Sequence, residues 1–383
     1  MAHNNTVFSQ LLKLISRHEF ESLSKAHHKG RKLRKTSRWS QFVSLCLGQL
    51  AGRHSLRDIE SNMKAQSSRL YHLGAQPVAK SSLGRLNEQQ PYTMYEALFA
   101  QLYARCQQLA PKHRFRFKNK LYSLDASLID LSLKIFPWAH YALGKAAMKL
   151  HVGLDHSGYI PQFAAITEGK VTDIEIGRTL QFSPGSIVVF DKGYTDYKWF
   201  KALNNKGVFF VTRLRKNAIW RVNERRYVDK NTGLTCDQTI TLTGIKAQKI
   251  GMPKLRRIGY RDPETNQYYE FITNNFKLSA NTIAAIYKER WQVELFFKWI
   301  KQNLKIKAFI GNSKNAIMTQ IWVGLCTCLM LAYIKFSAKL NWSLQKIIRI
   351  LQLNLFMRRD LLSLLRGDPP PDTGQEYNQM ALI

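Results

Sequence analysis

The spacing of apolar positions predicts that the first part of the chain is helical. Apolar side chains recur every three or four residues, which is typical of helices that bury one face. Helices are predicted over residues 8–15, 39–50, 56–63 and 92–109. Ser55 immediately precedes the third of these and is suited to cap it. We therefore expect residues 1–120 to form a helical module.

From residue 121 the pattern changes to short β-rich runs separated by Gly and Pro turns. Strands are predicted at residues 121–124, 148–154, 160–167, 186–190 and 208–214. Helical character appears between the later ones, at residues 172–180 and 197–206. The resulting order of three strands, helix, strand, helix, strand is typical of an α/β domain.

The remainder of the chain divides into a β-rich stretch and a helical stretch. Residues 215–275 alternate polar and apolar side chains, which predicts a β-rich insertion. Helices are predicted over residues 279–304, 316–340 and 343–365. The domain division expected from these patterns is a core formed by 121–214 and 276–340, interrupted by the insertion at 215–275, and a C-terminal helix and tail at 341–383.

The charge of the chain points to a polyanionic partner. The sequence holds 58 Lys and Arg against 26 Asp and Glu, a formal net charge of +32. This excess is spread along the chain, which fits a long polyanion such as DNA better than a small acidic substrate. The densest basic run, KGRKLRKTSR at residues 29–38, is either a solvated loop or a contact to DNA phosphates. We expect the basic module at 1–120 to bind DNA without the rest of the chain.

Cysteine usage favours a reducing cytoplasm, and hydropathy leaves one segment of membrane-spanning length to explain. Its five cysteines are scattered without paired spacing, so neither a disulfide framework nor a zinc site is indicated. The N-terminal sequence has no export signal. Residues 317–334 are apolar enough to span a membrane, but polar residues interrupt them, and a buried helix explains them equally well.

Two aspartates follow apolar runs that are predicted to be core strands. Asp125 follows LYSL, and Asp191 follows IVVF. The carboxyl ends of strands are where α/β sheets present functional groups. A single Asp at such a position is more often a turn or cap residue, so the pair carries the argument. Other acidic candidates do not follow a core run so directly; they are Asp130, Asp155 and Asp173.

Four polar residues in the helix predicted at 279–304 are spaced to share one face. Steps of 3, 4 and 7 residues separate Tyr287, Arg290, Glu294 and Lys301. An apolar stripe runs beside them, so Glu294 is able to point from a docked helix towards a site rimmed by cations. The alternative is an amphipathic helix with ordinary surface pairing of Arg and Glu.

The spacing Y-x2-R-x3-E-x6-K resembles the signature of the insertion-sequence-4 family of bacterial DDE transposases. Further resemblance lies in LYSLDASLIDLSL around Asp125, VVFDKGYTDY around Asp191 and RWQVELFFKWIKQNLKIK around Glu294. It covers nearly the whole chain. The resemblance implies an RNase H-like fold, metal ligation by Asp125, Asp191 and Glu294, and contacts of Tyr287, Arg290 and Lys301 with transposon-end DNA.

The implied reaction is cut-and-paste transposition by DNA cleavage and strand transfer. Two Mg²⁺ ions, with Mn²⁺ as an alternative, suit three carboxylate ligands and an in-line attack on a phosphodiester. A Walker-type phosphate loop is absent from the sequence, so no nucleotide cofactor is expected. Two other functions stay open from the sequence: a catalytically inactive DNA-binding relative, and a structure-specific nuclease without strand transfer.

Several aromatic residues and one histidine have two interpretations. Trp220, Tyr268 and Tyr269 are candidates to stack on an unpaired base, although a core position is the commoner role. Trp291 is able to pack against the core, and His151 is more typical of a buried histidine than of a catalytic base. Joining two DNA ends requires two active sites, so we expect a homodimer in the DNA complex. The helices after Lys314 either provide its contacts or complete the core.

Overall fold

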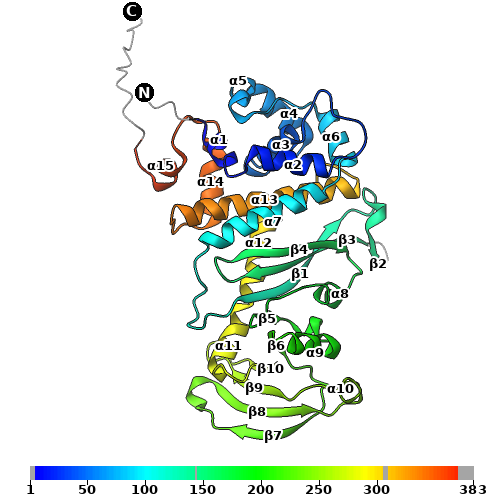
Figure 1. The fold of residues 1–383 in the computed structure, drawn as a ribbon, viewed down its shortest axis with the longest axis vertical. Helices are drawn as coiled ribbons and strands as arrows, with labels where there is room; N and C mark the ends of the chain where they lie inside the picture. Colours follow the sequence, from blue (N-terminus) through cyan, green and yellow to red (C-terminus); the bar gives the residue numbers. More distant parts are fainter. Residues whose placement is uncertain (1–4, 143–144, 305–308, 370–383) are drawn as a thin grey trace, which may run out of the picture.

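A computed structural model describes residues 5–142, 145–304 and 309–369 (Figure 1). The molecule is elongated, with a helical layer at one end, a sheet in the middle and a β-rich region at the other end. The helices are α1 (Val7–Leu12), α2 (Arg17–Ala26), α3 (Arg38–Leu50), α4 (Leu56–Ala65), α5 (Ser67–Leu70), α6 (Lys80–Gln89), α7 (Thr93–Leu109), α8 (Asp173–Gly177), α9 (Tyr197–Asn205), α10 (Ile245–Ile250), α11 (Ala280–Glu289), α12 (Trp291–Asn303), α13 (Lys314–Ser337), α14 (Leu344–Asn354) and α15 (Leu361–Arg366). The strands are β1 (Leu121–Leu131), β2 (His140–Ala142), β3 (Lys145–Asp155), β4 (Ile160–Glu168), β5 (Ile187–Phe190), β6 (Phe209–Arg213), β7 (Trp220–Arg226), β8 (Leu234–Leu242), β9 (Leu255–Arg261) and β10 (Tyr268–Thr273).

The central sheet has the strand order of an RNase H-like core. Strand β3 pairs with β4 on one side and with β1 on the other, and both pairings are antiparallel. Strands β1, β5 and β6 follow in parallel. This order, β4-β3-β1-β5-β6, confirms the predicted α/β fold, and all five strands predicted at 121–214 are present.

Each face of β5 packs against a different helical layer. Val188 and Phe190 lie in the hydrophobic cluster that includes the buried side chains of α9, whereas Ile187 and Val189 lie in the cluster that includes α11. All four side chains are fully buried. A strand covered on both faces is continuously apolar, which explains the run IVVF.

The β-rich insertion extends the central sheet instead of forming a separate unit. Strand β10 pairs antiparallel with β6, and β9, β8 and β7 follow in order. A buried ion pair joins two of these strands, with the Arg256 Nη2 atom 2.7 Å from the Asp237 Oδ2 atom. The short helix α10 connects β8 to β9. The prediction of a β-rich stretch is confirmed, and its pairing with the core was not foreseen.

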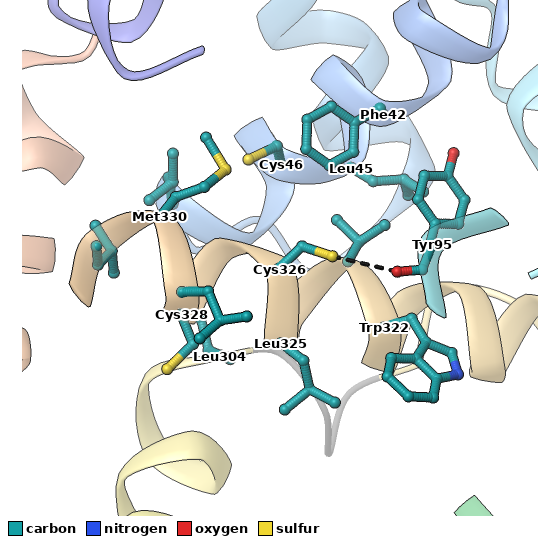
Figure 2. Packing of buried hydrophobic residues seen from close by; sticks show 14 of the residues in the cluster. Phe42, Leu45, Cys46, Tyr95, Leu304, Trp322, Leu325, Cys326, Cys328 and Met330 are labelled. Atoms are coloured by element: carbon teal, nitrogen blue, oxygen red, sulfur yellow. Dashed lines mark hydrogen bonds between the residues drawn. The ribbon is translucent and has the colours of Figure 1, made fainter. Parts of the chain in front are cut away.

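Helix α13 is the centre of the helical layer. This helix is long and apolar enough to cross a membrane. However, 94% of its most apolar 18-residue stretch is buried inside the protein. Figure 2 shows Trp322, Leu325 and Cys326 of this helix among residues from α3 and α7, and the Cys326 Sγ atom contacts the Tyr95 carbonyl oxygen. The alternative in which this helix completes the core is therefore confirmed. Its buried surface is not available for contacts between protomers.

The N-terminal helices share one core with α13 and with the C-terminal helices. Helices α3, α6 and α7 all pack on α13. At the edge of this layer the amide of Val7 donates to the Met357 carbonyl, and Thr6 forms an isolated antiparallel β-bridge with Arg358. The boundary expected at residue 120 stays a prediction, but the packing ties residues before it to residues after 314.

Three details of the helical layer differ from the sequence predictions. Helices α2 and α6 were not predicted, because their apolar positions are few. The helix expected over 343–365 is two helices, α14 and α15, and Asp360 caps the second through the amide of Ser363. Within the basic run at 29–38, Arg38 is buried, and its Nη2 atom donates to the Pro91 carbonyl. Its lysines and remaining arginines are exposed.

A buried histidine near the start of β1 gives a pH-dependent prediction for stability. Burial lowers the pKa of His156 from 6.5 to about 3, and the ring Nε2 atom lies 2.6 Å from the Ser123 Oγ atom. Between pH 6.5 and 3 the unfolded chain binds a proton at this position that the folded protein does not, so stability is present above pH 6.5 and is lost as pH falls. By pH 5 the free energy of unfolding is lower by about 2 kcal/mol because of this histidine.

We expect the His156→Gln variant to lose less stability than the unmodified protein between pH 7 and pH 5. Urea unfolding monitored by circular dichroism at both pH values measures this difference. The matched control is His18→Gln, because His18 is exposed on α2. Equal losses in all three proteins would show that His156 is protonated equally in the folded and unfolded states.

Candidate active site

The strand register places Asp125 and Asp191 side by side. Leu124 on β1 is the register partner of Phe190 on the parallel strand β5, and the next residue on each strand is an aspartate. Both side chains therefore leave the sheet at the same level. Asp125 is largely buried, with 21% of its side chain exposed, and Asp191 is partly exposed.

The position of Asp125 differs in one respect from the prediction. It does not end its strand, because β1 continues to Leu131 in antiparallel register with β3, where Asp125 faces Val152. Only the parallel pairing with β5 stops before Asp125. The predicted end of β1 was wrong because the continuous apolar run stops at Leu124, whereas the pairing with β3 maintains the strand to Leu131.

Two helices, instead of one, carry the four residues of the predicted helical face. Helix α11 ends at Glu289, α12 begins at Trp291, and Arg290 lies between them. The amide of Arg290 donates to the Tyr287 carbonyl and the amide of Val293 to the Arg290 carbonyl, so the helix tightens here. The prediction of one continuous helix was wrong, although Arg290 and Glu294 still lie within contact of each other.

Arg290 bridges two of the three carboxylates. Its Nη1 atom donates to the Asp125 Oδ2 atom at 3.0 Å, and its Nη2 atom donates to the Glu294 Oε1 atom at 2.5 Å. The guanidinium is 15% exposed, so these charge-assisted hydrogen bonds are shielded from solvent. The Arg290 contacts thus bring α12 and β1 together at the point where Asp125 lies.

The electrostatics of Asp125 reflect its burial. Desolvation raises its pKa from 3.8 to about 6, against the opposing effect of the Arg290 charge. The nearby charges of Asp191 and Glu294 act in the same direction as burial. The negative charges of Asp191 and Glu294 therefore disfavour ionisation of Asp125, and a bound cation would relieve this repulsion.

The donor set fits a hard divalent cation. Within the described ranges no three His, Cys, Asp or Glu side chains converge as a ready-made metal site. The guanidinium of Arg290 lies between Asp125 and Glu294 and is a cation held where positive charge is favourable. Carboxylate oxygens are the ligands that Mg²⁺ prefers.

Lys301 and Tyr287 contact the protein on either side of this site. The Lys301 Nζ atom donates to the Ser127 Oγ atom at 2.6 Å and to the Leu128 carbonyl at 2.8 Å. Tyr287 is 9% exposed, and its ring lies 4.7 Å from that of Phe271 and beside the Arg290 guanidinium. Lys301 thus ties α12, which carries Glu294, to β1, which carries Asp125, whereas Tyr287 packs on β10 and beside Arg290.

A pocket of roughly 340 Å³ lies next to Glu294, between α11 and the insertion. Its lining includes Tyr287, Arg290, Tyr269 and Trp291. Trp291 is 56% exposed, so it does not pack in the core as one alternative held.

The other aromatic residues singled out from the sequence lie elsewhere. Trp220 is partly buried and packs against the α9 cluster beneath Arg257, which favours a packing role. Tyr268 is 43% exposed but does not line the pocket in the described part of the chain.

The competing acidic residues occupy distinct environments. Asp155 is fully buried and accepts a hydrogen bond from the Tyr103 hydroxyl, and Asp130 is exposed. Asp173 lies beside Gly193, close to Asp191, and accepts a hydrogen bond from the Lys149 Nζ atom. This proximity could not be predicted from sequence patterns, because Asp173 begins a short helix 18 positions before Asp191 in the chain.

His151 is a buried histidine, as its strand position predicted. It is 1% exposed, its Nε2 atom lies 2.9 Å from the Thr167 Oγ1 atom, and burial lowers its pKa to about 4.

Sequence comparison identifies the family. A family model described as a transposase DDE domain matches residues 117–331. The chain belongs to the DDE transposase family. A second model, a domain of unknown function named DUF4372, matches residues 3–76. DDE transposases are enzymes that cleave and join DNA with divalent metal ions, and DNA transposition is the activity of this chain.

Individual relatives are described as transposases, which agrees with the assignment of this chain to the DDE transposase family. A protein of Sinorhizobium fredii described as a transposase, y4zB, is 33% identical over 305 residues, covering 78% of this chain and 81% of the relative. A protein of Geobacillus stearothermophilus, described as the transposase of insertion sequence element IS5377, is 24% identical and covers 68% of each chain. Among solved structures, a piggyBac transposase synaptic complex with hairpin DNA has a TM-score of 0.45 at 10% identity, covering 98% of this chain and 87% of that one.

Proposed function

We propose that this DDE transposase moves an insertion sequence by cut-and-paste transposition, with Asp125, Asp191 and Glu294 as catalytic metal ligands. The observation that carries the proposal is the register that places Asp125 beside Asp191, together with the single guanidinium that joins Asp125 to Glu294. In this proposal, release of Arg290 from Asp125 and Glu294 would allow the three carboxylates from β1, β5 and α12 to converge on the metal ions.

Asp125, Asp191 and Glu294 would hold two Mg²⁺ ions, for which Mn²⁺ is an alternative. When bound, such ions activate the attacking oxygen and neutralise the leaving oxygen of the phosphodiester. The protein groups orient the substrate: Arg290 turns from the carboxylates towards a DNA phosphate as a planar fork, and Lys301 adds a point charge. Neither a nucleophilic side chain nor a nucleotide cofactor is required.

We assign the chain to the insertion-sequence-4 family with Tyr287, Arg290, Glu294 and Lys301 as its signature. In this assignment Tyr287, Arg290 and Lys301 contact the transposon end. Tyr287 and Arg290 line the pocket beside Glu294, which supports this role. Lys301 is tied to β1, so its contact with DNA would depend on the path of the strand across β1.

Duplex DNA is the proposed substrate, at both the transposon ends and the target. The net charge of +32 and the exposed cations of the 29–38 run support DNA binding by the helical layer. The relatives are bacterial, and we place the protein on the nucleoid in the cytoplasm.

A homodimer in the DNA complex is proposed because one active site does not cut and join two ends in concert. The test mixes two inactive proteins: Glu294→Gln, and an intact-site variant that does not bind ends. Recovery of cleavage would show catalysis in trans. Cleavage by a complex that light scattering shows to hold one chain would rule out the dimer.

The overall proposal is tested by incubating the protein with a labelled duplex that carries the inverted repeat flanking its gene, a plasmid target and Mg²⁺. Cleavage at the end of the repeat and joining to the plasmid are expected. Cleavage without joining would favour the structure-specific nuclease, and binding without cleavage would favour the inactive relative.

A further inference from the structure

A basic groove lies beside the candidate active site, on the other face of the sheet from the Tyr287 pocket. It has a volume of roughly 800 Å³ and runs between α9, α10 and the segment that joins β6 to β7. Its lining residues are Arg178, Thr195, Asp196, Tyr197, Lys198, Arg215, Asn217, Ala218, Ile219, Leu242, Gly244, Ile245, Lys246, Ala247, Lys249 and Ile250.

The charge of this α9–α10 groove is strongly positive. Lys198, Arg215, Lys246 and Lys249 are exposed along it. Among the described residues that line it, Asp196 is the only acidic one. The Asp196 carboxylate is already engaged, because it accepts from the Arg178 Nη2 atom at 2.6 Å and from the Trp199 amide. The exposed cations therefore face solvent with little neutralising charge from the groove itself.

The α9–α10 groove begins at the catalytic edge of the sheet. The Arg215 Nη2 atom donates to the Lys192 carbonyl, the residue that follows Asp191. The pocket lined by Tyr287 and Arg290 lies on the α11 side of β5 and β6, whereas this groove lies on their α9 side. A pocket and a basic groove thus approach the acidic site from opposite faces of the same sheet.

We propose that the α9–α10 groove binds target DNA during strand transfer. The inference rests on the proposed function, in which a transposon end and a target must meet at one site. Because the α11 side is assigned to the transposon end, the α9 side is left for the second duplex. Phosphates of that duplex would contact Lys246 and Lys249 on α10, with Arg215 nearest the reacting phosphate.

The apolar residues of the groove fit a duplex better than a small anion. Ile219 and Ile245 are 65% and 73% exposed and both line the groove. Large apolar side chains among cations contact sugars and base steps in DNA that a protein bends. A small anion would use neither the length of the groove nor these two side chains.

The test compares a Lys246→Gln/Lys249→Gln variant with a Lys230→Gln/Lys277→Gln control. Both pairs are exposed, both remove two charges, and the control pair does not line the groove within the described residues. The assay supplies a pre-cut transposon end with a free 3′-hydroxyl and a plasmid target, and scores joining. In parallel, cleavage of the uncut end is measured without target.

The α10 variant is expected to lose strand transfer by about tenfold or more, with a salt slope for target capture lower by about two. Its cleavage of the uncut end should match that of the control. Unchanged strand transfer would overturn the inference, as would an equal loss of end cleavage, which would assign the groove to the transposon end or its flank. Absence of cleavage in the unmodified protein would instead refute the proposed function.

Discussion

The Asp125→Asn, Asp191→Asn and Glu294→Gln variants are each expected to cleave transposon-end DNA at least about a thousandfold more slowly than the unmodified protein. Each change removes one proposed metal ligand and keeps the shape of the side chain. Binding of the end should persist, because no DNA-contacting cation is removed. Single-turnover cleavage of a labelled end and fluorescence anisotropy of the same duplex measure the two effects separately.

Asp130→Asn is the matched control for these variants. Asp130 lies on β1, as Asp125 does, but it is exposed and was one of the competing carboxylates. Its cleavage rate should stay close to that of the unmodified protein. A near-normal rate in any of the three ligand variants would show that the site is assigned wrongly, and so would a loss of activity in Asp130→Asn equal to theirs.

DNA binding is expected to weaken by about a thousandfold or more between 50 and 200 mM salt. That figure corresponds to roughly six or more neutralised phosphates, each contributing a slope of about 0.9. Anisotropy titrations across this range give the slope directly. The formal charge of +32 makes such a number of phosphate contacts attainable.

A variant of the basic run at 29–38 tests how much of the salt dependence of DNA binding comes from that run. Lys32→Gln/Lys35→Gln removes two exposed charges and should reduce the slope by about two. Arg38 is excluded from the variant because it is buried against Tyr95 and the Pro91 carbonyl. A flat titration of the unmodified protein would mean that the positive charge does not serve DNA binding.

Local pattern predicted the strands of the core and the residues that follow them. The run IVVF before Asp191 is continuously apolar because helices cover both faces of β5. The same reasoning located Asp125, whose preceding residues Leu121 and Leu124 are buried. A sequence pattern is informative wherever burial alone determines the residue type.

Features that depend on pairing between distant segments could not be predicted. The extension of β1 past Asp125 depends on β3, and the joining of the insertion to β6 depends on β10. The interruption at Arg290 left the apolar spacing on either side unchanged, so periodicity gave no sign of it. At this interruption the Arg290 guanidinium donates to Asp125, a residue 165 positions away in the sequence.

The late position of α13 in the chain has a consequence for how the protein is made. Helices α3, α6 and α7 pack against α13, and it cannot reach them until residue 337 has left the ribosome. At bacterial elongation rates these helices wait roughly ten to forty seconds with their apolar faces uncovered. This packing argues against the expectation that residues 1–120 bind DNA by themselves: a gene copy interrupted before codon 314 would yield an aggregation-prone fragment for proteases to clear, instead of a small DNA-binding protein able to block the ends of intact elements.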